Sequence, residues 1–150
     1  MYYCSIELKA MQKIEDVILF QVDLTSKVSK QHTQRDFDNL NLGITVEQWV
    51  ILKIISESPS LSQKELAQKS YRDPASITRT LDLLEKKDLL RRESMPENRR
   101  MHMIVLTNEG KQFIKKNMKL VQSHRDQSTK GITKKELEQL SAILEKIRNN

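Results

Sequence analysis

The spacing of apolar residues along the chain predicts a mostly helical protein with one short hairpin. A first long helix is expected over 8–35, because residues from Ile14 to Val28 recur at helical spacing. After a polar break at 39–43, the pattern predicts three short helices (45–58, 62–70 and 74–87), two strands (89–93 and 101–106) and helices that begin near 107 and 133.

Short sequence signals mark where three of these helices begin. Thr45 and Gln48, and likewise Ser62 and Glu65, have the spacing of a capping box, in which two side chains satisfy two free backbone N–H groups. Asp73 followed by Pro74 combines a cap residue with proline at the first helical position. The residues expected to face the core are Trp49, Leu52, Ile55, Leu66, Ala67, Ile77, Leu81 and Leu84.

The order helix, helix, helix, strand, strand over 45–107 predicts a winged helix-turn-helix. In such a module the second helix of the turn enters the DNA major groove. The helix over 74–87 turns its apolar stripe to the core, so its opposite face would present Ser76, Thr78, Arg79, Thr80 and Asp82. Arg79 could bond two guanine atoms, and the hydroxyls could bond bases or phosphates. The alternative is an ordinary solvated helix face.

The turn between the two strands carries a second candidate contact. We expect Glu97, Arg99 and Arg100 at its tip, where an arginine could enter the narrow, electronegative minor groove. Arg99 would enter that groove, Arg100 would contact phosphates, and Glu97 would orient Arg99. The alternative is a turn kept soluble by its charges. One geometry would serve both the helix and the wing, which favours the DNA-binding interpretation.

Charge and composition narrow the classes of function. The 150 residues carry a formal net charge of +6, which favours an anionic partner, and residues 111–150 hold 10 basic against 4 acidic side chains. We interpret the lysines over 111–119 as a solvated face with a secondary role in attracting DNA. The single cysteine, Cys4, excludes an intramolecular disulfide, and with no evident membrane span or signal peptide the sequence predicts a cytoplasmic protein.

Enzymatic chemistry finds little support in the sequence. His32, His102 and His124 are scattered without a metal-ligand spacing, and the three glycines form no phosphate-binding loop. We therefore predict no catalytic residues, no metal and no cofactor. The serious alternative to DNA binding is a winged helix that acts only as a protein-interaction module.

Five segments together resemble the MarR family of bacterial winged helix-turn-helix regulators. They are QKELA (63–67), DPASITR (73–79), LLEKK (83–87), PENRR (96–100) and LTNEG (106–110). The resemblance implies a homodimer that binds pseudo-palindromic double-stranded DNA, usually as a repressor, and that is often released by a small phenolic or aromatic effector. It also implies that Arg99 is the minor-groove residue.

With this resemblance, the expected DNA-binding set becomes Ser62, Gln63, Arg72, Ser76, Thr78, Arg79, Thr80, Arg99 and Arg100. An effector pocket between the dimer helices and the DNA-binding lobe would be lined by Met11, Phe20, His32, Phe37 and Trp49, although residues at helical spacing are more often core. Two departures from the family pattern stand out. Asp88 replaces a frequent glycine, and no cysteine lies near Gln21, where the peroxide-sensing branch has one.

The terminal segments are expected to form the dimer interface. We divide the chain into a dimerisation helix and connector (1–44), a winged helix-turn-helix lobe (45–107) and C-terminal dimerisation helices (108–150). A 28-residue first helix would be about 42 Å long and would overhang the lobe. Its apolar stripe and the stripe Leu137, Leu140, Leu144 and Ile147 would be exposed in a monomer. The alternative is that the first and last helices pack within one chain.

Overall fold

The computed structural model describes residues 13–95 and 98–150, and the chain separates into two compact units, residues 1–50 and 51–150. In the first unit a 3-10 turn, η1 (Ile14–Asp16), precedes helix α1 (Ile18–Asn39). The expected start of this helix at Leu8 is wrong for the part that the structure describes. Val17 is extended (φ −75°, ψ 115°), so α1 begins at Ile18 and has 22 residues, about 33 Å.

The end of α1 is joined to the start of α2 (Val46–Glu57) by side-chain hydrogen bonds. The Gln34 side-chain oxygen accepts from the Val46 backbone N–H at 2.9 Å. The expected capping box is present, because the Thr45 hydroxyl accepts from the Gln48 N–H at 3.1 Å and the Gln48 side chain accepts from the Thr45 N–H at 3.0 Å. Buried Phe37 and Trp49 meet edge to face with ring centroids 6.2 Å apart.

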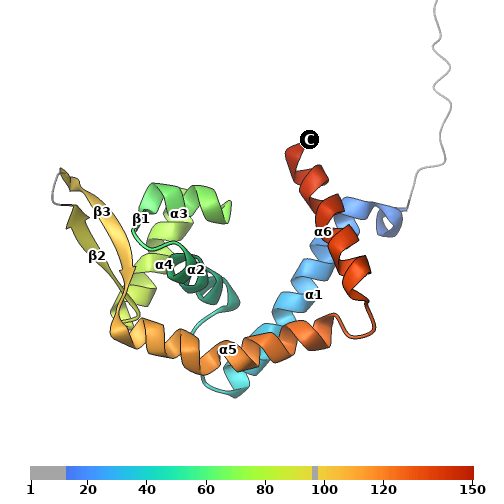
Figure 1. Ribbon diagram of the computed structural model, residues 1–150, viewed down its shortest axis with the longest axis horizontal. Helices are drawn as coiled ribbons and strands as arrows, with labels where there is room; N and C mark the ends of the chain where they lie inside the picture. The colour runs from blue at the N-terminus through green and yellow to red at the C-terminus, as the bar shows by residue number, and fades with distance from the viewer. Residues whose placement is uncertain (1–12, 96–97) are drawn as a thin grey trace, which may run out of the picture. The chain divides into compact units, whose positions relative to one another are not determined.

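The second unit contains the helix-turn-helix and the hairpin, and it confirms the predicted fold class (Figure 1). After α2 come β1 (Leu61–Ser62), α3 (Gln63–Ser70), α4 (Pro74–Lys86), β2 (Leu90–Met95), β3 (Asn98–Leu106), α5 (Asn108–Ser128) and α6 (Lys134–Asn149). Strand β1 was not predicted, since two residues are too few to show an alternating pattern.

The three described strands form an antiparallel sheet in the order β1-β3-β2. Leu61 lies opposite Ile104 and Leu90 opposite Leu106. The register then shifts between Ser94 and Met95, since Ser94 pairs with His102 but Met95 with Asn98. The strands therefore extend further towards the turn than the sequence pattern predicted.

The core of the second unit is built mainly from the predicted apolar stripes. Ile55, Leu66, Ile77, Leu81 and Leu84 are all at most 2% exposed. Leu90 and Ile104 join them from the sheet, and Ile114 from α5. Because α4 contributes three of these side chains along one face, its orientation in the module is determined and the rest of its surface is left for other contacts.

The starts of α3 and α4 follow the predicted signals, since Ser62 and Glu65 form a capping box and Asp73 caps α4 with Pro74 at its start. A further capping box, which was not predicted, joins Thr133 and Glu136 at the start of α6. At the end of α4, Asp88 has φ 56°, and the Leu89 N–H donates to the Leu84 carbonyl at 3.0 Å. This is the left-handed helix end that glycine usually occupies, so the departure noted at Asp88 is accommodated without a change of motif.

The capping box at α3 gives a pH-dependent prediction. The Glu65 carboxylate accepts hydrogen bonds from the Ser62 hydroxyl and backbone N–H, at 2.6 and 2.8 Å, and these bonds lower the pKa of Glu65. A lowered pKa stabilises the fold above the ordinary glutamate pKa of about 4.3, and this stabilisation is lost as the pH falls through the folded value.

We therefore expect Glu65→Gln to unfold at a lower urea concentration than the wild type at pH 7, with the difference shrinking as the pH falls through that window. Urea midpoints at a series of pH values measure this, and Glu57→Gln is the exposed control. A difference that is independent of pH would contradict the role given to the Glu65 charge.

Candidate nucleic-acid interface

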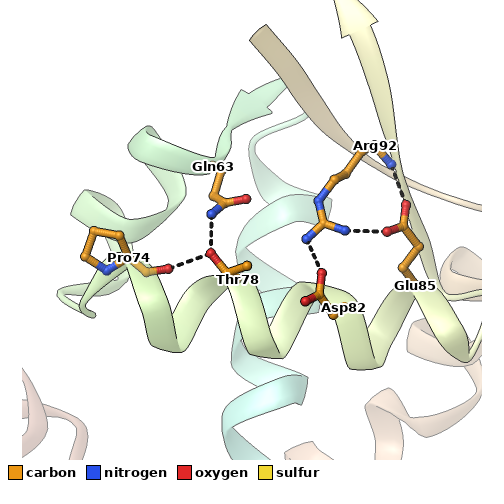
Figure 2. A network of polar contacts seen from close by, with 6 residues as sticks. All are labelled: Gln63, Pro74, Thr78, Asp82, Glu85 and Arg92. Atoms are coloured by element: carbon orange, nitrogen blue, oxygen red, sulfur yellow. Dashed lines mark hydrogen bonds and ion pairs between the residues drawn. The ribbon is translucent and has the colours of Figure 1, made fainter. Parts of the chain in front are cut away.

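Helix α4 is held near its start by a contact with α3. The Gln63 side-chain amide donates to the Thr78 hydroxyl at 2.6 Å, and that hydroxyl donates to the Pro74 carbonyl at 2.9 Å (Figure 2). Two predicted DNA-binding residues, Gln63 and Thr78, are thus brought together. The Gln63 amide and the Thr78 hydroxyl are hydrogen-bonded to each other. The contact sets the position of α4 relative to α3.

Near its other end, α4 is held by Arg92 of the hairpin (Figure 2). The guanidinium Nη2 lies 2.6 Å from Asp82 Oδ1, and Nη1 donates to Glu85 Oε2. The second oxygen of Glu85 accepts from the Arg92 backbone N–H at 3.0 Å. The Arg92 side chain is only 22% exposed, so this pair of contacts is partly shielded from water. The contact ties strand β2 to α4.

Sequence reasoning missed Arg92 and Glu85. A signal was available, because Arg92 follows buried Leu90 by two residues in a strand and so points to the same face. The sequence analysis also assigned Asp82 to the DNA-facing surface. In the structure this carboxylate is paired with Arg92.

The surface of α4 that faces away from these contacts carries Arg79. Arg79 is exposed, while Ser76 and Thr80 are half-buried on either side of it in the sequence. Arg79, Leu83 and Lys86 are exposed at helical spacing, so they form one outward stripe. Of the five residues predicted for the outer face, only Arg79 and Asp82 are exposed, and Asp82 is paired with Arg92.

The other predicted residues of the helix-turn-helix lie around its edges. The Ser62 hydroxyl takes part in the α3 capping box, and the half-buried Arg72 lies in the turn before α4, where its backbone N–H donates to the Ala67 carbonyl at 3.1 Å. These positions leave the Arg72 guanidinium as a further cation beside the start of α4.

The predicted wing residues are placed differently from expectation. Arg99 and Arg100 belong to strand β3 rather than to the turn. Because the register shifts, they lie between the paired positions Asn98 and His102. Glu97 lies outside the described residues. The prediction of a turn over 97–100 is wrong in this respect, since the pattern of apolar residues alone did not reveal the strand's polar first three residues.

Comparison with known proteins finds one family that is similar to this chain. The model of the MarR family matches residues 44–102, which run from the connector before α2 to strand β3 and include the whole helix-turn-helix.

Over this segment the chain is similar to the MarR family.

Solved structures of MarR-family proteins share the fold over most of the chain. A crystal structure of MarR is 25% identical, with a TM-score of 0.73 over 89% of this chain and 96% of that one. A mutant MarR from E. coli in complex with operator DNA is 23% identical, with a TM-score of 0.80 over 90% and 97%. A MepR–DNA complex from S. aureus is 21% identical, with a TM-score of 0.79 over 89% and 97%.

The residues that we assigned to an effector pocket lie in the first unit. Phe37 and Trp49 are buried against each other, Phe20 is half-buried, His32 is exposed, and Met11 lies outside the described residues. Phe37 and Trp49 thus act as core side chains of the first unit.

Metal-binding and membrane-spanning features are absent from the described residues. Within 13–95 and 98–150, no group of three or more His, Cys, Asp or Glu side chains could hold a metal ion. None of the helices in those same ranges has the length and apolar character needed to span a membrane.

Proposed function

We propose that the protein is a bacterial, cytoplasmic transcriptional regulator that binds DNA sequence-specifically as a homodimer. The observation that carries this proposal is the way α4 is held. Gln63 fixes one end of the helix and Arg92 the other, while Arg79 projects outward between them. Direct readout of bases requires an exposed side chain on a rigid helix. If the helix were mobile, ordering it would add an entropic cost to every contact with DNA.

In this proposal each element has one role in recognition. Helix α4, 13 residues and about 20 Å long, lies in a major groove about 12 Å wide, with the Arg79 guanidinium bonded to guanine. Arg99 of the hairpin is proposed to enter the minor groove and Arg100 to contact phosphates. Arg92 connects the two contacts, since it joins the hairpin to α4. Ser76 and Thr80 contribute hydrogen bonds at the edges of the helix.

The solved complexes give independent support. MarR and MepR, whose folds match this chain, have been crystallised with DNA. The alternative, a winged helix that binds only proteins, has no specific observation in its favour. It is kept as an outcome of the experiment below.

Homodimer formation is supported by apolar side chains that the single chain leaves uncovered. Ile18, Leu19, Val22, Leu24 and Val28 are exposed along α1. On α6, Leu140 and Ile143 are exposed, and Leu137, Leu144 and Ile147 are half-buried. Burying one such side chain gains roughly 1.5–3 kcal/mol, so a shared interface built from the terminal segments is favoured. A two-fold dimer would address half-sites about 34 Å apart.

Repression, and release from DNA by a small phenolic or aromatic effector, complete the proposal. Both follow from the family resemblance stated above. The basic face of α5, with Lys111, Lys115 and Lys119 exposed, adds long-range attraction for DNA.

Arg79 provides the direct test. DNA is first selected from a random duplex pool with the wild-type protein, and affinities for the selected duplex and a shuffled one are then measured by fluorescence anisotropy. We expect Arg79→Ala to weaken binding to the selected duplex about tenfold, by loss of a contact worth 1–3 kcal/mol, and to relax the preference at one base pair. Arg99→Ala should weaken binding and reduce the salt slope by about one unit.

The matched control is Arg125→Ala, which removes the same charge from an exposed position in α5. Its affinity should stay close to that of the wild type. If the wild-type protein selects no sequence and binds no duplex even at low salt, the proposal is wrong, and the protein-interaction module becomes the leading interpretation.

A further inference from the structure

Tyr71 is an unusual residue for the turn between α3 and α4. Its backbone is left-handed, with φ 53° and ψ 38°, a conformation that glycine or asparagine adopts far more readily than an aromatic residue. Its side chain is 88% exposed, the highest value among the exposed large hydrophobic residues that the structure describes. The left-handed backbone ends α3, because the Tyr71 N–H donates to the Gln68 carbonyl at 3.2 Å, but this role does not require an aromatic ring. The exposed ring is therefore better explained by a contact with another molecule.

Tyr71 lies at the side of an open groove with a volume of about 750 Å³. Two cations and two amides line this groove: Lys64, Arg72, Gln63 and Gln68. Ala67 and Pro74 form its apolar surface together with the Tyr71 ring. Among the described residues that line the groove, none carries a carboxylate. The groove is therefore complementary to an anion that also presents an apolar group.

The groove borders the proposed recognition helix. Gln63 and Pro74 line it and also contact Thr78 of α4, as Figure 2 shows. A DNA strand that passes the start of α4 in the major groove would therefore pass the groove as well. Its phosphates would meet Lys64 and Arg72.

We propose that this groove, here called the Tyr71 groove, holds one DNA strand beside the start of α4, and that the Tyr71 ring contacts the methyl group of a thymine. The inference rests on the proposed DNA-binding function and adds a specificity-determining residue to it. The thymine methyl is the apolar group that distinguishes one base from the others in the major groove, and an aromatic ring among hydrogen-bond donors is suited to select it. Lys64 and Arg72 hold the neighbouring phosphates.

A thymine-to-uracil scan tests the contact atom by atom. In the duplex selected by the wild-type protein, each thymine is replaced in turn by uracil, which lacks only the methyl group. We expect one position in each half-site at which uracil weakens wild-type binding about fourfold, the factor that corresponds to exposure of one methyl group. That penalty should persist in Tyr71→Phe and disappear in Tyr71→Gly. Tyr71→Gly should itself bind the selected duplex at least tenfold more weakly.

Folding is controlled separately. Tyr71→Gly relieves the left-handed backbone, so its melting temperature should be equal to or above that of the wild type. Ser60→Gly is the matched control, because Ser60 is exposed, has φ 70° and does not line the Tyr71 groove. It should leave both DNA affinity and the uracil penalties unchanged.

The outcomes separate this inference from the function on which it rests. If the wild type selects a sequence but no uracil penalty depends on Tyr71, the Tyr71 contact is wrong and the DNA-binding proposal stands. If the wild type selects no sequence, both are wrong. A groove that instead binds a protein would give wild-type DNA affinity in Tyr71→Gly, which also overturns the inference.

Discussion

Gly110→Ala is expected to destabilise the fold by about 3 kcal/mol, at the upper end of the usual cost of overpacking. A Cβ atom at Gly110 would lie 1.9 Å from the carbonyl oxygen of Leu89 and 2.9 Å from its carbonyl carbon. Backbone atoms cannot rotate away as a flexible side chain can, so the start of α5 and the start of β2 must separate. The same Leu89 oxygen accepts from the Thr107 N–H at 3.3 Å, and that bond would be strained as well.

Thermal unfolding measures this effect, and the melting temperature should fall by about 10 °C for a chain of this size. The sign of the change in stability is informative, because a glycine-to-alanine substitution inside an exposed helix normally stabilises the protein by up to about 1 kcal/mol. Gly131→Ala is the control. Its Cβ would meet nothing within 4 Å, and only its φ of 86° opposes the change. If Gly110→Ala lowers the melting temperature no more than Gly131→Ala does, the close approach of residue 110 to Leu89 does not contribute to stability.

Arg92→Met is expected to lower both the stability and the DNA affinity. The methionine keeps most of the side-chain bulk but leaves Asp82 and Glu85 without their shared cation. Hydrogen bonds to charged groups contribute about 1.5–3 kcal/mol each, and the partial exposure of the two acids argues for about 2 kcal/mol in total. Because the hairpin is then no longer tied to α4, affinity for the selected duplex should fall about tenfold in addition to the loss of stability, measured where the variant is fully folded.

Arg91→Met is the matched control for this change. Arg91 lies 2.6 Å from Glu93 in an exposed pair, and such pairs contribute at most about 1 kcal/mol. Adding Glu85→Gln to Arg92→Met should recover part of the stability, because one unpaired charge is removed. Equal effects of Arg91→Met and Arg92→Met on DNA affinity would show that Arg92 acts only through its charge and not by tying the hairpin to α4.

Much of the fold could be predicted from local patterns in the sequence. The starts of α2, α3 and α4 were located correctly because each signal, a capping box or a cap residue followed by proline, lies within a few neighbouring residues. The buried stripe Ile77, Leu81 and Leu84 was predicted for a similar reason, since helical periodicity is a property of one segment. At Asp88 the sequence showed only a departure from the frequent glycine, and the structure shows that the left-handed helix end is kept.

Predictions failed where the sequence signal was weak or ambiguous. The predicted first helix starts too early in the sequence. The helical spacing of apolar residues continues through Val17, although the backbone at Val17 is extended. The predicted hairpin is too short. Asn98, Arg99 and Arg100 lack the alternation of apolar and polar residues that is typical of a strand. Asp82 was placed towards DNA, since nothing within α4 itself indicates that a cation from β2 pairs with it.

Sequence patterns were sufficient to predict the winged helix-turn-helix, the core face of α4 and Arg79 as a candidate base contact. The module follows from the order of its elements, and the helix face and the arginine from spacings of a few residues within one element. The sequence did not reveal that Arg92 joins the hairpin to α4, that Gln63 bonds Thr78, or that residue 110 must be small; these are visible only in the folded chain. Each of those contacts joins residues from different elements, 7–21 positions apart, so it exists only once the chain has folded.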